Sequence, residues 1–399
     1  MSLIKRVLST LSERRDKVLS GNINSIPSPF KRFSNDFIGV EQGRLYLVTS
    51  YTKVGKTQFS SYLFLYNTIL YAYRHPDQIR VKIFYYPLEE TPEQVTCRFI
   101  SFLLYYLSRG RIIKSPVDLM SSKNVAIEQE VLDILKTEEY KNILDFFEKS
   151  VLFSDSTNAS GVWFECQRYA QEHGKVFYDQ TTYKDEFGKE QHGKKFNHYE
   201  SDDPDEYRIV FYDHLALTSP ERGMDLRQTM SKLSEYFVLL RNRYNFSAVI
   251  IQQQAITDNL EAFKSQKLRP TIANLGDAKT VARDIDVCIG LFSPYRYELT
   301  KYPQTPEGYD ITKFKDNIRF AEILLNRHGQ SNGMIALLFI GQCNYWQELP
   351  LSKETMKIQE IYKFLDTINN RVSKSFFSYS LRNLLRRFHN TNNLINFTK

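Results

Sequence analysis

The sequence predicts an α/β fold with a mostly parallel central β-sheet. Apolar segments of strand length alternate with segments of helix length over most of the 399 residues. Continuous apolar strands are typical of a sheet that is covered by helices on both faces, as in βαβ units. The hydrophobic content of 42% supplies a buried core and the 25% of charged residues supplies a normal surface, which excludes global disorder.

Composition excludes several other classes of protein. The longest apolar runs, such as residues 336–340, are much shorter than the roughly 20 residues that a membrane helix needs. The first residues lack the apolar stretch of a signal peptide. The four cysteines are widely separated and have no metal-ligand spacing, which indicates reduced thiols in a cytoplasmic protein. Together with the short apolar runs, this predicts no membrane partner.

The two ends of the chain differ from the alternating region between them. Residues 1–20 have apolar side chains at helical spacing before Gly21, which predicts an N-terminal helix. Residues 350–399 are expected to be a helical extension. From Lys353 onward this extension has nine basic and three acidic residues, so it carries six of the seven net positive charges. Such a tail suits either a polyanionic partner or a solvated helical surface.

The alternating region, residues 21–349, is expected to form the main domain. We expect strands at 44–49, 81–86, 151–153, 209–212, 248–251, 287–292, 321–325 and 333–339. We expect helices within 50–72, 92–108, 124–149, 161–173 and 225–244. Residues 175–206 interrupt this order with two segments around a polar stretch that contains Gly188, which predicts an inserted β-hairpin followed by an acidic loop.

The strongest chemical signal is the segment from Ser50 to Thr57, which lies between a predicted strand and a predicted helix. It matches the phosphate-binding pattern GxxxxGK[ST], except that Ser50 replaces the first glycine. Backbone N–H groups at the helix start can cradle phosphates if the backbone comes close at Gly55. Lys56 can then reach the β- and γ-phosphates, and the Thr57 hydroxyl can bind Mg²⁺. The pattern predicts ATP and Mg²⁺ as cofactors, with these binding residues: Ser50, Val54, Gly55, Lys56, Thr57 and Gln58.

Two carboxylates follow other predicted strands. Asp213 ends the apolar strand 208–213, where it can hold Mg²⁺ beside the phosphate loop, although many strands end in aspartate. Glu89 follows strand 81–86, where a carboxylate can polarise the water that attacks the γ-phosphate. Glu89 and Glu90 could equally begin a helix, because acids suit its N-terminal dipole.

Together these three elements resemble the motor domain of DnaB-type replicative helicases, which are hexameric RecA-like P-loop ATPases. The family's phosphate loop also commonly lacks its first glycine. Its catalytic glutamate lies in a stretch similar to residues 88–98, where this chain has one extra residue before Pro92. The resemblance extends over roughly residues 21–341, and it implies a RecA-like ATPase core with Glu89 as the water-activating base.

The resemblance implies further roles for residues of this chain. The strand at 248–251 is similar to the family's sensor strand, which implies a sensor role for Gln253. The segment 323–329 is similar to the family's arginine-finger segment, which implies that Arg327 contacts the ATP of a neighbouring subunit. Leu325 stands where the family usually has a lysine. Residues 269–287 resemble the DNA-contacting loop and the strand behind it, although 276–279 depart from the family's Arg-Glu-Ser-Gly; the implied DNA-binding residues are Gly276, Asp277 and Lys279.

The implied function is that of an ATP-dependent replicative DNA helicase, a ring that translocates on single-stranded DNA. The resemblance implies a homo-oligomer, expected to be hexameric, with Mg-ATP hydrolysed at subunit interfaces. Residues 1–20 fit the family's linker helix, which packs on the next subunit; packing on its own core is the alternative. We expect the family's N-terminal primase-binding domain to be absent, which would suit a phage-encoded motor in the bacterial cytoplasm. A primase or a loader is a further candidate partner.

Three alternatives stay open at this point. The chain could be a RecA-like recombinase or a helicase loader, or it could be a catalytically quiet nucleotide-binding scaffold.

The hairpin lies outside the family pattern. It could contact DNA through its lysines or decorate the rim of the ring; those lysines are Lys184, Lys189, Lys194 and Lys195.

Overall fold

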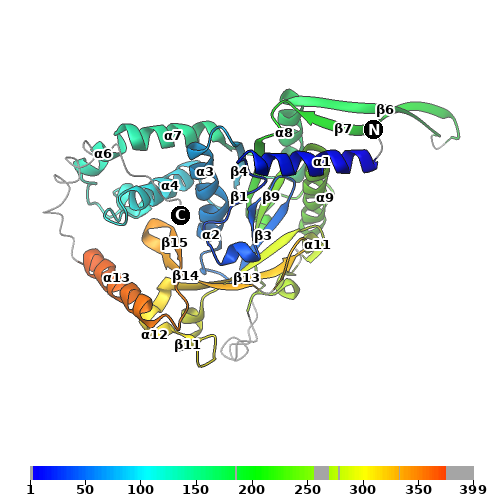
Figure 1. Ribbon diagram of the computed structural model, residues 1–399. Helices are drawn as coiled ribbons and strands as arrows, with labels where there is room; N and C mark the ends of the chain where they lie inside the picture. The colour runs from blue at the N-terminus through cyan, green and yellow to red at the C-terminus, as the bar shows by residue number, and fades with distance from the viewer. Residues whose placement is uncertain (1–2, 185–186, 256–268, 277–278, 332, 374–399) are drawn as a thin grey trace.

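A nine-stranded β-sheet forms the centre of the molecule (Figure 1). The computed structural model describes residues 3–184, 187–255, 269–276, 279–331 and 333–373. In spatial order the strands are β15 (Tyr345–Glu348), β14 (Met334–Ile340), β13 (Ile318–Asn326), β10 (Val287–Phe292), β3 (Leu45–Ser50), β9 (Ser247–Gln253), β8 (Glu206–Asp213), β4 (Arg80–Pro87) and β5 (Val151–Phe153). Every neighbouring pair from β10 to β5 is parallel. The expected mostly parallel sheet is therefore confirmed.

The pairs between β10 and β15 are antiparallel, so the expectation of continued βαβ order is wrong on this side of the sheet. Short connections explain the antiparallel β13–β14 and β14–β15 pairs. Residues 327–333 join β13 to β14, and residues 341–344 join β14 to β15. A parallel pair needs a crossover of about a dozen residues or more, so strands joined this closely pair antiparallel.

Helices cover both faces of the sheet (Figure 1). One face is covered by α2 (Lys56–Ser60), α3 (Asn67–Arg74), α4 (Pro92–Leu107), α6 (Gln129–Leu135) and α7 (Glu138–Ser150), and the other by α8 (Ala159–Glu172) and α9 (Leu226–Tyr244). A π-helical stretch, Ser61–Tyr66, joins α2 to α3. Along β3, Tyr46 and Val48 pack on the first face, whereas Leu45 and Leu47 pack on the second. Because strand side chains alternate, an apolar residue at every position serves both layers.

The antiparallel side of the sheet has a core of its own, which it shares with α13 (Thr355–Ser373). Ile358 and Leu365 of α13 are buried in this core together with Phe320 and Leu338 of the sheet. The predicted C-terminal extension is thus helical as far as Ser373, and the rest of it lies outside the described residues. The smaller elements are β1 (Ile26–Pro27), β2 (Gly39–Val40), α5 (Pro116–Leu119), α11 (Lys279–Ala282), β11 (Lys301–Tyr302), β12 (Tyr309–Asp310) and α12 (Ile311–Phe314).

Two sequence expectations about the chain as a whole can be compared with these elements. None of the helices within the described ranges is long and apolar enough to cross a bilayer. All four cysteines are buried and unpaired, as their spacing predicts.

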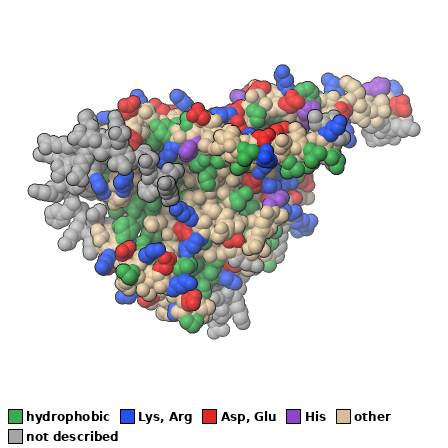
Figure 2. All heavy atoms as spheres, viewed as in Figure 1, with side chains coloured by type: hydrophobic (Ala, Val, Ile, Leu, Met, Phe, Trp, Pro, Cys, Tyr) green, Lys and Arg blue, Asp and Glu red, His purple; other side chains and the backbone are tan. Residues whose placement is uncertain are grey.

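The N-terminal helix α1 (Leu3–Leu19) lies on the surface with an apolar stripe exposed. The stripe comprises Ile4, Val7, Leu8, Leu11, Val18 and Leu19, each at least half exposed. In the space-filling view, hydrophobic side chains are visible at the surface over α1 (Figure 2). Polar contacts hold the helix to the rest of the chain: Lys17 pairs with Asp205, and Arg14 pairs with Glu41 at 3.0 Å.

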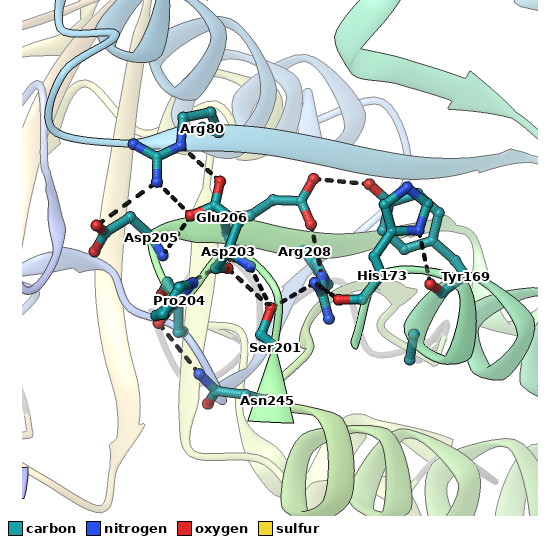
Figure 3. Close-up of polar contacts among 12 residues, drawn as sticks. Arg80, Tyr169, His173, Ser201, Asp203, Pro204, Asp205, Glu206, Arg208 and Asn245 are labelled. Atoms are coloured by element: carbon teal, nitrogen blue, oxygen red, sulfur yellow. Dashed lines mark hydrogen bonds and ion pairs between the residues drawn. The ribbon is translucent and has the colours of Figure 1, made fainter. Parts of the chain in front are cut away.

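The expected hairpin is formed by β6 (Gly174–Lys184) and β7 (Glu190–Ser201), and it projects from the body of the molecule (Figure 1). A polar network fixes its base (Figure 3). Arg208, only 3% exposed at its side chain, donates to the Glu206 carboxylate at 2.7 Å and to the Tyr199 hydroxyl at 2.6 Å. Arg80 holds the acidic loop through Asp203. The hairpin is therefore anchored at one end of β8, opposite the end that carries Asp213.

Candidate nucleotide-binding site

The carboxyl ends of four parallel strands bring the candidate site residues together. Ser50 at the end of β3 pairs with Gln253 at the end of β9. Asp213 at the end of β8 pairs with Pro87 of β4, just before Glu89. Ligands of open α/β sheets bind beyond this edge, so the structure places these predicted residues where a nucleotide would bind.

The phosphate loop connects β3 to α2. Ser50 is buried, and its carbonyl accepts a hydrogen bond from the Gln254 N–H at 2.9 Å, which ties the loop to β9. Gly55 precedes α2 with φ +104°, a left-handed conformation that favours glycine. Lys56 then begins the helix, so the loop has the backbone course that a phosphate cradle requires.

Thr57 and Asp213 form the candidate metal site. The Thr57 hydroxyl donates to the Asp213 carboxylate at 3.4 Å. Burial raises the pKa of Asp213 to about 7, and the nearby Lys56 ammonium opposes this shift. A hydroxyl and a carboxylate beside a phosphate loop fit Mg²⁺, which binds oxygen ligands and usually one or two carboxylates together with substrate phosphates. No cluster of three or more His, Cys, Asp or Glu that could hold a metal occurs among the residues that the structure describes.

The two adjacent glutamates have different surroundings. Glu90 forms an ion pair with Arg98 of α4, and burial raises the pKa of its carboxyl group. Glu89 is exposed, and its negative charge raises the pKa of the nearby Asp213. Of the pair, Glu89 is therefore the carboxylate that remains available to a water molecule in the site.

His214 is a site residue that sequence reasoning missed. Burial and the nearby Lys56 ammonium lower the pKa of its imidazole, which is therefore neutral at pH 7. Its Nδ1 atom is buried and has no hydrogen-bond partner among the described residues. Its position directly after Asp213 is the one sequence signal that could have identified it.

A hydrogen-bonded connection links the phosphate loop to the candidate DNA-contacting segment. The Asn274 amide donates to the hydroxyl of Tyr51 in the loop at 3.1 Å. The buried Gln254 amide donates both to the Thr49 hydroxyl and to the Thr271 carbonyl. Gly276, two residues after Asn274, is exposed.

The other two candidate DNA-binding residues have little structural description. Asp277 lies outside the described residues. Lys279 begins α11, and the placement of its side chain is likewise outside them. No sequence pattern indicates the Tyr51–Asn274 contact, because 223 residues separate the two positions.

Arg327 lies at the opposite edge of the sheet from the phosphate loop. It follows Asn326, which pairs with Val287 at the start of β10, whereas the loop leaves the carboxyl end of β3. Arg327 is exposed, and its Nε atom donates to the Ile285 carbonyl at 2.8 Å. The structure therefore brings Lys56, Glu89, Asp213 and Gln253 together within one chain and leaves Arg327 apart from them.

The sheet order and the phosphate loop define a RecA-like P-loop ATPase fold. The chain is similar to a solved structure described as an ATPase domain, with a TM-score of 0.56, 15% identity, and coverage of 88% of this chain and 100% of that one. It is also similar to a DnaB-like replicative helicase solved with attention to its interactions with primase. That likeness has a TM-score of 0.55 and 14% identity, and it covers 87% of this chain and 66% of the helicase.

These likenesses confirm the resemblance to the DnaB-type motor domain at the level of the fold. No protein-family model matches the chain. No curated protein matches it by sequence either. The roles of individual residues therefore depend on the geometry of the site itself.

Proposed function

We propose that this chain is a ring-forming, ATP-dependent DNA helicase motor that translocates on single-stranded DNA. One observation carries the proposal: the site at the carboxyl edge of the sheet contains an activating carboxylate and a candidate metal site, whereas Arg327 lies at the other edge of the subunit. A site divided in this way is complete only when a second copy supplies Arg327. Head-to-tail contacts of this kind generate rings or filaments.

Each residue of the site has a proposed role in phosphoryl transfer. Lys56 and the N–H groups of the loop bind the phosphates, and Glu89 orients and deprotonates the attacking water. Thr57 and Asp213 would hold Mg²⁺, which when bound neutralises charge on the β- and γ-phosphates. Gln253, beside Ser50 at the end of β9, senses the γ-phosphate and passes its state toward residues 269–276.

The exposed stripe of α1 supports assembly with a second copy. The exposure of six apolar side chains to water is unfavourable, and their burial on a neighbouring subunit would remove that apolar surface from water. The ion pairs of Lys17 and Arg14 keep the helix on its own subunit while the stripe remains available. We propose that α1, the linker of residues 1–20, docks on the next subunit, and that residues 21–349 form the motor.

The DNA-binding side of the proposal involves the segment next to the phosphate loop. Gly276 can offer its backbone N–H to a phosphate, and Asp277 and Lys279 lie beside it in the sequence. Binding through the DNA backbone would be tolerant of sequence and would weaken with salt. A primase or a loader is a further proposed partner, since one solved neighbour is a helicase studied with primase.

The test is ATP hydrolysis by the purified chain with and without single-stranded DNA, alongside its mass in solution. The proposal predicts a ring-sized assembly whose hydrolysis rises with DNA and which unwinds a forked duplex. Hydrolysis by a ring without unwinding would instead indicate a recombinase or a loader. A monomer that binds ATP without hydrolysing it would indicate a nucleotide-binding scaffold.

A further inference from the structure

Arg319, at the start of β13, is 1% exposed, which is less than any other charged side chain in the described part of the chain. It lies at the edge of the sheet that carries the phosphate loop. Its neighbour Phe320 pairs with Phe292, one residue beyond the Leu291 that pairs with Ser50. A buried charge is costly unless it is paired and hydrogen-bonded, so its contacts indicate what it does.

Each nitrogen of the Arg319 guanidinium group has a carbonyl or carboxylate oxygen as a partner. Its Nε atom donates to the Val54 carbonyl of the phosphate loop at 2.7 Å. Its Nη1 atom donates to the carbonyls of Asp316 at 2.7 Å and Ile318 at 2.9 Å, and Nη2 lies 3.0 Å from the Asp316 carboxylate. Burial lowers the pKa of the group to about 10, so it stays charged at neutral pH.

Two aromatic rings complete a platform beneath the loop. The guanidinium carbon lies 5.2 Å from the centroid of Phe339, and Phe339 stacks on Trp346 with centroids 4.2 Å apart. A Cβ atom on Gly55 would lie 3.5 Å from Trp346 and 3.6 Å from Phe339, so both rings lie in van der Waals range of the loop. The peptide unit between Val54 and Gly55 thus rests on Arg319, Phe339 and Trp346.

We propose that Arg319 is a positioning residue for the phosphate loop: by holding the Val54 carbonyl, it directs the Gly55 N–H toward the phosphates. The carbonyl oxygen and the amide hydrogen of a trans peptide point in opposite directions. Fixing the carbonyl on the platform therefore aims the N–H away from it, into the loop. The inference rests on the proposed function, because it requires that the loop binds a nucleotide.

Two substitutions separate the hydrogen bond from the charge. In Arg319→Gln the amide nitrogen is as many bonds from the backbone as Nε, so a donor to Val54 remains while the positive charge is lost. In Arg319→Lys the charge remains, but the ammonium lies one bond further out, beyond the position from which Nε reaches Val54. Each variant keeps only part of the donor set of Arg319, so circular dichroism first establishes that each is folded.

Arg208 offers a matched control. It is buried to a similar extent, with 3% of its side chain exposed, and at the base of the hairpin it holds Glu206 (Figure 3). It also donates to the Tyr199 hydroxyl. Arg208→Gln removes an equally buried positive charge at the far end of β8. It should lower thermal stability without changing nucleotide affinity.

The measurement is the affinity of each folded variant for Mg-ADP by isothermal titration calorimetry, with Lys56→Ala as the variant without phosphate binding. We expect Arg319→Gln to bind nearly as tightly as the wild type. We expect Arg319→Lys to bind about tenfold more weakly, as for the loss of one charge-assisted hydrogen bond. Thermal unfolding checks that the order of affinities does not follow the order of stabilities.

The opposite order, with Arg319→Lys tight and Arg319→Gln weak, would overturn the inference and show that only charge matters. Equal affinity in both variants, whether high or low, would overturn it as well. If the wild type itself fails to bind Mg-ADP, the proposed function has failed. If the wild type binds and Lys56→Ala does not, the nucleotide-binding part of the proposed function stands whichever result the Arg319 variants give.

Discussion

At the scale of single residues, Glu89 and Glu90 are neighbours in sequence with different partners. We expect Glu89→Gln to keep ATP binding and to lose hydrolysis by about a hundredfold or more, because a general base contributes at least that much. ATP binding by calorimetry and phosphate release measured on the same sample check this prediction.

Glu90→Gln is the matched control for this prediction. It breaks the ion pair with Arg98, so we expect it to lower the melting temperature while most of the hydrolysis remains. Hydrolysis that disappears in Glu90→Gln and persists in Glu89→Gln would reverse the two assignments.

Asp213 predicts a pH dependence of stability in the protein without metal and nucleotide. Its pKa is raised to about 7 in the folded state, so between pH 4 and 7 the folded state binds a proton that the unfolded state has lost. The free energy of unfolding therefore falls as pH rises through this range, by at most about 1.4 kcal/mol per pH unit, and above it the titration of this group causes no further change.

Denaturant unfolding of the wild type and of Asp213→Asn at pH 5, 6, 7 and 8, in the presence of EDTA, isolates this contribution. The difference between the two should change up to about pH 7 and then level off. A difference that is constant from pH 5 to 8 would contradict the raised pKa.

Sequence reasoning at this scale finds residues that follow a local pattern. The loop residues and Asp213 stand at strand ends, where the sequence itself marks them. Arg319 carries no such mark, because its function depends on the Val54 carbonyl, 265 residues away in the chain. From the sequence alone, a lone arginine at the start of an apolar strand is predicted to lie at the surface, whereas the fold buries this one.

At the scale of elements, the apolar stripe of α1 gives a prediction about assembly. Leu8→Asp places a charge in the stripe, and Ser9→Asp places the same charge beside it on the same exposed helix. We expect Leu8→Asp to reduce the assembled fraction at equal concentration and Ser9→Asp to leave it nearly unchanged. Analytical ultracentrifugation measures both, and equal effects would show that the stripe is not an interface.

The hairpin gives a prediction about DNA. Its residues 174–201 contain five lysines and five acids, so they offer no net positive charge to a phosphate backbone. Replacing residues 178–197 by Asn-Gly, a two-residue turn, keeps the Phe177–His198 pair and the anchored base. We expect unchanged affinity for single-stranded DNA and an unchanged salt dependence of binding. A weaker affinity with a shallower salt dependence would assign the hairpin lysines to DNA.

Elements differ in how far the sequence predicts them. Apolar runs and the turn-forming residues that bound them predict most strands, the inserted hairpin and α9. The direction of β13, β14 and β15 does not follow from such runs, because an apolar strand looks the same in either orientation. The short connections after Asn326 and Ile340 indicate only that these three strands alternate in direction.

At the scale of the whole molecule, the separation of Arg327 from the phosphate loop predicts complementation between two inactive variants. Lys56→Ala lacks a working loop but keeps Arg327, and Arg327→Ala has the reverse defect. In an equal mixture, about one interface in four joins an intact loop to an intact Arg327. We expect each variant alone to be nearly inactive and the mixed assemblies to recover ATP hydrolysis.

The control is a mixture in which one chain carries both substitutions, which should recover no activity. Full hydrolysis by Arg327→Ala alone would contradict the assignment of Arg327. Co-assembly of the two single variants without recovery would contradict a shared site.

Strand β13 connects the phosphate loop of its own subunit to the arginine that the proposed ring offers to a neighbouring subunit. Arg319 near its first residue holds the subunit's own phosphate loop, and Arg327 follows its last residue, about 27 Å further along an extended strand. β13 pairs with β14 over Ile318–Glu322 and with β10 as far as Asn326, so we expect a displacement at Arg319 to pass along the strand toward Arg327. In the proposed ring, filling one site would therefore adjust the arginine offered to one neighbour and not to the other. Such coupling would be directional, and it would set the order in which the subunits hydrolyse ATP.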